Sequence, residues 1–262
     1  MTVPTIRTSQ LGGSPGMPAL IIGPSLGTSV AALWAGVAQR LAGMYYVIGW
    51  DLPGHGMSAP PRGAFTIEDL AAGVIEAVNQ HLGTQPFIYA ASSVGGAVGL
   101  QLLLGYPERV ESAALICTGA RIGDPGDWHA RAHVVRTAGT GEVVALSVRR
   151  WFTPGFFERE PTCARELLET LRHVDDDGYA WTCEALADFD ARDRLPEIDT
   201  PIIAVAGAKD IATPPDSVRF IAAHVARGRF VQVPNAAHLA PVEQPDRIAD
   251  VLVKLKRRRT NG

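Results

Sequence analysis

The sequence predicts an α/β fold in which a mostly parallel β-sheet is covered by helices on both faces. Short apolar, β-branched runs of strand length alternate along the 262-residue chain with longer segments that have the spacing of helices. This alternation is typical of parallel sheets, because a crossover helix must return the chain to the edge where the previous strand began. The alternation fails from about Ile122 to Leu195, which indicates an insertion between two strands.

The individual elements follow in order from these patterns. Six apolar runs are predicted to be buried strands: Ala19–Ile22, Tyr45–Trp50, Phe87–Ala90, Ala113–Cys117, Ile202–Ala206 and Phe230–Val233. Five segments are predicted to be helices: Ala31–Leu41, Ile67–Leu82, Val94–Leu104, Pro215–Ala226 and Pro245–Leu255. The last helix is followed by Lys256-Arg257-Arg258-Arg259, a basic end that suits a helix C-terminus, and residues Arg259 to Gly262 are expected to be a short disordered tail.

The interrupted region is predicted to be a helical cap. Its aromatic residues stand in helix-like segments that Pro154-Gly155 breaks: Trp128, Trp151, Phe152, Phe156, Phe157, Tyr179 and Trp181. We therefore divide the chain into a core domain of residues 1–121 and 196–262 and a cap of residues 122–195. The cap is expected to be inserted after the sixth strand of the sheet.

Composition limits the classes of partner. A net charge of −3 without a basic stripe argues against nucleic acid and membrane surfaces. The three cysteines, Cys117, Cys163 and Cys183, have no C-x-x-C spacing, so we expect reduced thiols in a cytoplasmic protein and no metal site. No signal-peptide pattern opens the chain, and no apolar run approaches the roughly 18 residues of a membrane span. We expect no cofactor and a small-molecule partner; the oligomeric state stays open.

A candidate nucleophile stands directly after the strand Phe87–Ala90. The segment Ala91-Ser92-Ser93-Val94-Gly95 joins that strand to a helical run, which is the context of a nucleophile elbow, G-x-S-x-G. The strained turn needs small residues two positions before and after the serine, and Ala91 and Gly95 meet this need for Ser93. Choosing Ser92 would put Val94 at a small position. Ser93 is therefore favoured, although a plain helix N-cap would have a similar sequence.

A serine hydroxyl needs a histidine to take its proton and a carboxylate to orient that histidine. His238 lies in a loop after the last predicted strand, and Asp210 follows the apolar strand Ile202–Ala206, at the edge where open α/β sheets bind ligands. The chain order Ser, Asp, His is the one that this elbow requires. The remaining histidines and the neighbouring aspartates are interpreted as solvated, capping or loop residues: His55, His81, His129, His133, His173, His224, Asp188, Asp190, Asp193 and Asp199.

An oxyanion hole is expected from two main-chain N–H groups. Val94 should supply the first, because it follows the nucleophile at a helix N-terminus. The second should come from the loop Gly23-Pro24-Ser25-Leu26-Gly27-Thr28, after the first predicted strand, and Leu26 is the candidate. A space-filling role for Leu26 is equally compatible with the sequence.

From about Ala19 to Leu255 the chain resembles the 3-oxoadipate enol-lactonases, a family with the α/β-hydrolase fold. Motifs general to that fold are Asp51-Leu52-Pro53-Gly54-His55-Gly56-Met57-Ser58, the elbow, and the Asp210 and His238 loops. Segments that resemble this family in particular are Ser25-Leu26-Gly27-Thr28, Thr118–Gly123, Trp128–Arg131, Val135-Arg136, Arg150–Pro154 and Tyr179–Asp190. The chain departs from the family at Ala91 and at Ser9–Pro18, a Gly- and Pro-rich stretch where relatives usually have a hairpin, so one edge strand is expected to be missing.

The resemblance implies a carboxylic-ester hydrolase of aromatic-acid (β-ketoadipate) catabolism. In that reaction Ser93 attacks the carbonyl of an unsaturated γ-lactone with an acetate arm, the ring opens to an acyl-enzyme, and water releases 3-oxoadipate. An enol leaves more easily than an alkoxide, so no metal is needed. The carboxylate arm calls for an arginine, and Arg131 and Arg136 are candidates, with Trp128 and Trp151 as walls of the pocket.

Two other functions stay open. A carboxylesterase could use the same triad on another small ester or lactone, and a ligand-sensing homologue could turn its ligand over slowly. Dehalogenase and epoxide-hydrolase chemistry is disfavoured, because those relatives have aspartate where this chain has Ser93.

Overall fold

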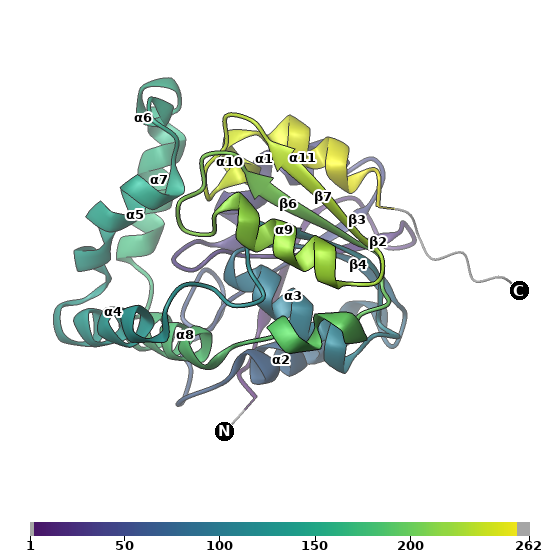
Figure 1. The fold of residues 1–262 in the computed structure, drawn as a ribbon, viewed down its shortest axis with the longest axis horizontal. Helices are drawn as coiled ribbons and strands as arrows, with labels where there is room; N and C mark the ends of the chain where they lie inside the picture. Colours follow the sequence, from purple (N-terminus) through teal and green to yellow (C-terminus); the bar gives the residue numbers. More distant parts are fainter. Residues whose placement is uncertain (1–2, 256–262) are drawn as a thin grey trace, which may run out of the picture.

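Residues 3–255 are described in the computed structural model, and they form a seven-stranded sheet with helices around it (Figure 1). The strands are β1 (Arg7–Gly12), β2 (Ala19–Gly23), β3 (Tyr46–Asp51), β4 (Phe87–Ser92), β5 (Val110–Ile116), β6 (Ile202–Gly207) and β7 (Gly228–Val233). The helices of the core are α1 (Val30–Leu41), α2 (Ile67–Leu82), α3 (Val94–Gly105), α9 (Pro215–His224), α10 (Ala240–Glu243) and α11 (Pro245–Leu252). The predicted basic end, Lys256–Arg259, and the predicted tail, Arg259–Gly262, lie outside the described residues.

The sheet confirms the predicted α/β architecture. Its strand order is β1-β3-β2-β4-β5-β6-β7, with β1 antiparallel to β3 and every other neighbouring pair parallel. All six predicted strands are present, with ends displaced by up to three residues. The last of them, β7, was predicted to be buried but is a partly buried edge strand. The first strand was not predicted, because β1 is an edge strand whose polar sequence Arg7-Thr8-Ser9-Gln10 is only partly buried. The apolar run that marks a central strand is therefore absent from it.

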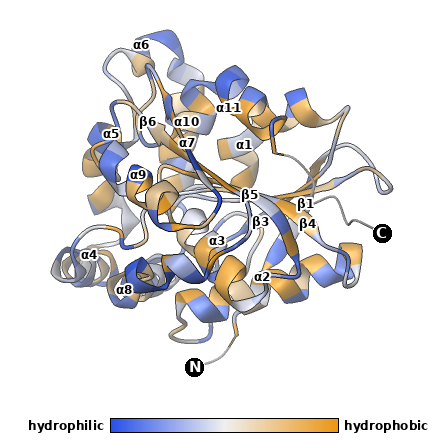
Figure 2. Ribbon diagram, turned by 45° about the vertical axis from the view of Figure 1, so that its right-hand side comes forward, coloured by the Kyte–Doolittle hydropathy of each residue, from blue (hydrophilic) through white to orange (hydrophobic). Residues whose placement is uncertain are grey.

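Helices cover both faces of the sheet (Figure 2). One pair, α1 and α11, packs together, and α2 packs against α3, while α9 lies on β6 and β7. The indole N–H of Trp34 on α1 donates a 2.9 Å hydrogen bond to the carbonyl oxygen of Gly23, so this helix is tied to the end of β2. The central strands β2, β4 and β6 are buried along their whole length, as expected of strands covered on both sides. None of the described helices is long and apolar enough to cross a membrane.

The insertion is helical, but it follows the fifth strand of the sheet rather than the sixth. Between β5 and β6 the chain forms α4 (Pro125–Ala138), η1 (Thr140–Val143), α5 (Val144–Trp151), α6 (Phe156–Arg159), α7 (Pro161–Arg172), α8 (Asp176–Asp188) and η2 (Arg192–Glu197). The strand count was wrong by one because Gly13, Pro15, Gly16 and Pro18 leave room for one strand, not two, before β2. Figure 1 shows α4 to α8 together on the side of the sheet toward which β6 and β7 point.

The loop after β3 joins the core to this cap. The carboxylate of Asp51 accepts hydrogen bonds from the main-chain N–H of Val30 (2.7 Å) and of Met57 (3.0 Å), and so caps α1 and closes the loop. The carbonyl oxygen of Gly54 accepts a 3.0 Å bond from Asp175 N–H, at the start of α8. The Asp51–Ser58 motif therefore has a structural role in this chain: it fixes a core loop beneath a cap helix.

His55 is completely buried in that loop. Its Nδ1 lies 3.0 Å from the carbonyl oxygen of Pro53, and its ring stacks on that of Tyr179 in α8, with 6.3 Å between the ring centroids. Burial lowers the pKa of His55 to about 4, against the hydrogen bond to Pro53, which raises it. The folded protein therefore holds His55 neutral at a pH where the unfolded chain would bind a proton.

We expect this histidine to make stability pH-dependent. Because the pKa is lower in the folded state, the stabilisation is complete above pH 6.5 and is lost as the pH falls toward 4; its share between pH 7 and pH 5 is about 2 kcal/mol. Urea unfolding at both pH values should show a smaller loss for His55→Gln than for the wild type. His129→Gln, at an exposed site, is the control and should behave as the wild type does. An equal loss in His55→Gln and wild type would contradict the prediction.

Candidate active site

Ser93 stands on the sharp turn between β4 and α3. Its backbone has φ 56° and ψ −120°, a conformation that residues other than glycine rarely adopt. Two hydrogen bonds hold the turn: Ser93 N–H donates to the carbonyl oxygen of Ile116 at 2.9 Å, and the Thr118 hydroxyl donates to the carbonyl oxygen of Ser93 at 2.7 Å. The sequence Ala91-Ser92-Ser93-Val94-Gly95 thus has the geometry of a nucleophile elbow.

Ala91 fits in the elbow because its neighbours have no side chains. It pairs with Gly23 of the adjacent strand β2, and a Cβ atom on Gly23 would lie 2.9 Å from the Ala91 methyl carbon. A Cβ on Gly95 would lie 3.0 Å from the same carbon. The methyl group of Ala91 therefore occupies space that glycines at positions 23 and 95 leave free.

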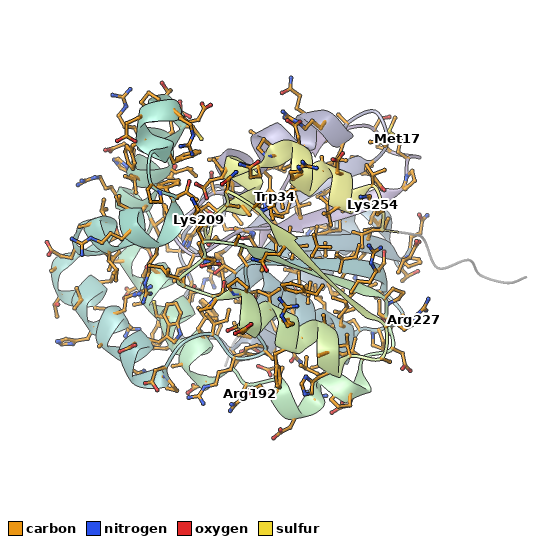
Figure 3. The ribbon with its side chains drawn as sticks, turned by 45° about the horizontal axis from the view of Figure 1, so that its top comes forward. Met17, Trp34, Arg192, Lys209, Arg227 and Lys254 are labelled. Carbon is orange, nitrogen blue, oxygen red and sulfur yellow. The ribbon has the colours of Figure 1, made fainter. Side chains whose placement is uncertain are left out.

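Ser93, His238 and Asp210 form one chain of hydrogen bonds. Ser93 Oγ lies 2.9 Å from His238 Nε2, and His238 Nδ1 lies 2.9 Å from Asp210 Oδ2. His238 comes from the loop after β7 and Asp210 from the loop after β6. Figure 3 labels Lys209, the exposed residue before Asp210, at the end of the sheet that faces the cap. With its proton on Nδ1, His238 can accept the Ser93 proton at Nε2.

The carboxylate of Asp210 is held ionised. Its burial would raise its pKa, but His238 and the hydrogen bonds from Thr213 outweigh burial, and the pKa lies below its usual value. The Thr213 hydroxyl donates to Oδ2 at 2.7 Å, and the N–H groups of Ala212 and Thr213 donate to Oδ1 at 2.8 and 3.0 Å. A charged, fixed carboxylate is what a histidine base needs for orientation and for stabilisation of its cation.

The two predicted oxyanion donors lie at the same edge of the sheet. Because β2 and β4 are parallel neighbours, the loop that carries Leu26 and the turn that precedes Val94 leave the sheet side by side. Within residues 3–255 no acceptor pairs with the main-chain N–H of Leu26 or of Val94. Leu26 also lines the cavity that contains Ser93. Both N–H groups are thus free to bind an oxyanion, a role that stays a proposal.

The cap closes over Ser93 and leaves a cavity of about 70 Å³. Three of the four predicted substrate-binding residues, Trp128, Arg131 and Trp151, line it together with Ser93 and His238. The guanidinium of Arg131 lies over the Trp128 ring, 4.7 Å from the centroid. The cap therefore places a cation and two indole rings above the candidate nucleophile.

The fourth predicted residue, Arg136, does not line the cavity, so its predicted role in substrate binding is wrong. Its guanidinium pairs with the Glu184 carboxylate, lies 3.7 Å from Asp177 and stacks on the Trp181 ring at 4.4 Å. Arg136 is exposed at the junction of α4 and α8. It contributes to the packing of the cap.

Arg150 and Tyr179 are among the cavity residues that the sequence interpretation missed. Arg150 directly precedes Trp151 on α5, and Ser147 lies one helical turn before it; all three line the cavity. The predicted pocket residue Trp151 was therefore the signal that could have identified its neighbour Arg150. Burial lowers the pKa of Arg150, and the charge of Arg131 lowers it further. Tyr179 is buried beside Arg131, and burial raises the pKa of its hydroxyl. The cavity thus contains two arginines, Arg131 and Arg150, together with two aspartates, Asp124 and Asp127.

The other histidines stay outside this cavity in the part of the chain described. Ser92 is completely buried, and its hydroxyl has no partner among the described residues, so the rival nucleophile cannot meet His238. Residues 3–255 contain no group of three or more His, Cys, Asp or Glu side chains able to hold a metal ion.

We expect Ser93→Ala to reduce ester hydrolysis by a factor of at least about 10⁴, because the loss of one triad member disables the unit. The fold should persist, since within residues 3–255 the Ser93 hydroxyl bonds to His238 alone. Ser92→Ala is the matched control and should keep the wild-type kcat. Steady-state hydrolysis of an aryl ester measures the activity of each variant, and circular dichroism measures whether its fold persists. Full activity in Ser93→Ala, or its loss in Ser92→Ala, would show that the nucleophile is misassigned.

Comparison with known proteins agrees with this geometry. Residues 19–251 match the model of the alpha/beta hydrolase family. The chain is 36% identical over 233 residues to 3-oxoadipate enol-lactonase 2 of Acinetobacter baylyi, across 89% of this chain and 86% of that protein. It is 29% identical to 3-oxoadipate enol-lactonase 1 of the same organism, across 92% and 90%. The crystal structure of the enol-lactonase from Burkholderia xenovorans LB400 superposes with a TM-score of 0.89 and 32% identity, across 95% of each chain.

These similarities extend over nearly the whole chain, cap included. These three similar proteins are enol-lactonases, and the fold, the serine elbow and the hydrogen-bonded triad of this chain agree with that similarity. The chain therefore belongs to the alpha/beta hydrolase family, within its group of 3-oxoadipate enol-lactonases, and is a hydrolase of ester or lactone bonds.

Proposed function

We propose that this enzyme opens 3-oxoadipate enol-lactone to 3-oxoadipate in the cytoplasm, as a step of aromatic-acid (β-ketoadipate) catabolism. The observation that carries the proposal is the pair of arginines, Arg131 and Arg150, in the cavity of Ser93 and His238. A lactone with a carboxylate arm presents an electrophilic carbonyl and an anion in one small molecule. The cavity offers a nucleophile for the first and cations for the second. The names of the similar enol-lactonases support the same choice.

The proposed reaction proceeds in two halves through an acyl-enzyme. Ser93 Oγ attacks the lactone carbonyl carbon while His238 Nε2 takes the hydroxyl proton, and Asp210 stabilises the resulting imidazolium. The N–H groups of Leu26 and Val94 bind the oxyanion. The ring C–O bond then breaks, and the enol oxygen leaves with the proton from His238. This enol becomes the ketone of the product, which makes the leaving group a good one.

The second half uses the same residues in reverse. His238 takes a proton from water, and the resulting hydroxide attacks the substrate's acyl carbon, which is bonded to Ser93 Oγ. The same two N–H groups bind the new oxyanion. The bond from the acyl carbon to Ser93 Oγ breaks, and Oγ regains its proton from His238. The free serine is restored, and the product molecule now has two carboxylates.

The arginine pair explains how the carboxylate arm is held. Arg131 and Arg150 lie close enough for the charge of one to lower the pKa of the other, and both side chains are half-buried. A carboxylate between them relieves this repulsion and accepts charge-assisted hydrogen bonds. The rings of Trp128 and Trp151 limit the space around the bound molecule. Asp127 also lines the cavity and disfavours an arm that has a second negative charge.

A carboxylesterase that acts on a different small ester is the second candidate, and a slow ligand-sensing homologue is the third. Purified enzyme should hydrolyse the enol-lactone with a kcat/KM at least about a hundredfold above that for a neutral aryl acetate, if each arginine contributes a charge-assisted hydrogen bond. Steady-state kinetics on both substrates measure this ratio. A larger kcat/KM for the neutral ester would favour the carboxylesterase, and single-turnover behaviour on both would favour the sensor.

The arginines themselves provide a sharper test. Arg131→Gln and Arg150→Gln should each raise KM for the enol-lactone about tenfold to a hundredfold and change KM for the neutral ester little, because only the lactone has an arm to hold. Arg136→Gln removes a cap arginine outside the cavity and should leave both KM values as in the wild type. Equal effects of a cavity variant on both substrates would contradict the proposed recognition.

A further inference from the structure

Glu243 joins two segments of the chain that meet at the active site. It is the last residue of the short helix α10, five positions after His238. Its Oε1 accepts hydrogen bonds from the main-chain N–H of Thr153 at 2.8 Å and from the Thr153 hydroxyl at 2.6 Å. Its Oε2 accepts a bond from the main-chain N–H of Ala237 at 2.5 Å. One oxygen therefore binds the cap and the other binds the loop of the candidate base.

Each bound segment carries residues of the site. Ala237 directly precedes His238, whose ring lies between Ser93 and Asp210. Thr153 follows the end of α5, which carries the cavity residues Arg150 and Trp151. A main-chain bond from Leu239 N–H to the Trp151 carbonyl oxygen, 3.1 Å long, runs alongside the Glu243 bonds. The histidine loop and the end of α5 are thus joined on both sides of His238.

The contacts of Glu243 are strong and specific. All three donors point at a carboxylate, and such charge-assisted bonds are about twice as strong as neutral ones. Thr153 is buried, and the Arg159 guanidinium donates to its hydroxyl oxygen at 3.3 Å, which directs the hydroxyl proton toward Glu243. Without the carboxylate, the N–H groups of the buried residues Ala237 and Thr153 would lose their acceptors.

We propose that Glu243 is a positioning residue that locks the cap to the histidine loop, so that His238 keeps its alignment on Ser93 while Arg150 and Trp151 stay over the cavity. Glu243 itself lies outside the lining of that cavity. The effect on His238 applies to any ester, whereas the effect on Arg150 rests on the proposed function, because it requires a substrate with a carboxylate arm.

Two substitutions separate the two sides of this lock. In Glu243→Gln one oxygen remains, and because Thr153 offers two donors and Ala237 one, the oxygen stays with Thr153 and the new amide group opposes Ala237 N–H. We expect kcat to fall about tenfold on both the enol-lactone and a neutral aryl ester, since a small displacement of a reacting group costs this much or more. Thr153→Val removes one cap donor and should raise KM for the enol-lactone about threefold, with a smaller change in kcat.

The control is Glu76→Gln, an exposed glutamate of α2, which should match the wild type. Thermal unfolding of every variant separates loss of folded protein from loss of rate per folded molecule. Wild-type kcat on both substrates in Glu243→Gln, with only a lower Tm, would overturn the proposal, as would identical kinetic changes in Glu243→Gln and Thr153→Val. If the wild type fails to hydrolyse the enol-lactone, the proposed function falls, and kcat of Glu243→Gln on the neutral ester still decides the role of Glu243 at His238.

Discussion

The positive φ of Ser93 is the constraint on which the rest of the structure depends. A non-glycine residue in a rare backbone region costs of order 1–3 kcal/mol, and it persists only where the surroundings fix it. Here Ile116 and Thr118 bond the turn from the next strand, and glycines at positions 23 and 95 give the backbone of β4 and α3 room to approach β2. The strain is useful because it lifts Oγ out of the sheet edge and leaves the Val94 N–H unpaired beside it.

Parallel topology then determines what can meet this serine. The loops after β2, β6 and β7 all leave the sheet at the edge where β4 ends, so Leu26, Asp210 and His238 converge although they are far apart in the chain. Asp210 and His238 come from adjacent parallel strands, and the Thr213 hydroxyl holds the carboxylate in register with Nδ1. The core therefore assembles the candidate triad, while cap residues line the cavity above it.

The same division explains which features could be predicted from the sequence. The central strands are apolar along their length and Ser93 directly follows one of them, so both were predictable from short patterns. Of the two edge strands, β7 was predictable because it contains the run Phe230-Val231-Gln232-Val233, whereas β1 has the polar sequence Arg7-Thr8-Ser9-Gln10 and was not. In α4 only Ala132 and Val135 are buried, so periodicity does not specify which face meets the cavity. For that reason the sequence could not distinguish Arg131 from Arg136 as the residue that lines the cavity. In the structure Arg136 packs on α8, and Arg131 lines the cavity. The role of Glu243 was not predictable because its two bonds to Thr153 join residues 90 positions apart in the sequence.

Separation of chemistry from recognition has a physical consequence for specificity. In the proposed mechanism the triad and the oxyanion donors act on any acyl carbon, so they contribute equally to the transition states of competing esters. Discrimination must come from groups that contact the remainder of the molecule, and in this cavity the charged side chains apart from the candidate base are Asp124, Asp127, Arg131 and Arg150. The charge of Arg131 lowers the pKa of the half-buried Arg150, and in the proposed function a substrate carboxylate offsets the repulsion between the two cations. Substitutions in α4 and α5 can therefore change the preferred substrate while the bonds among Ser93, His238 and Asp210 stay as they are.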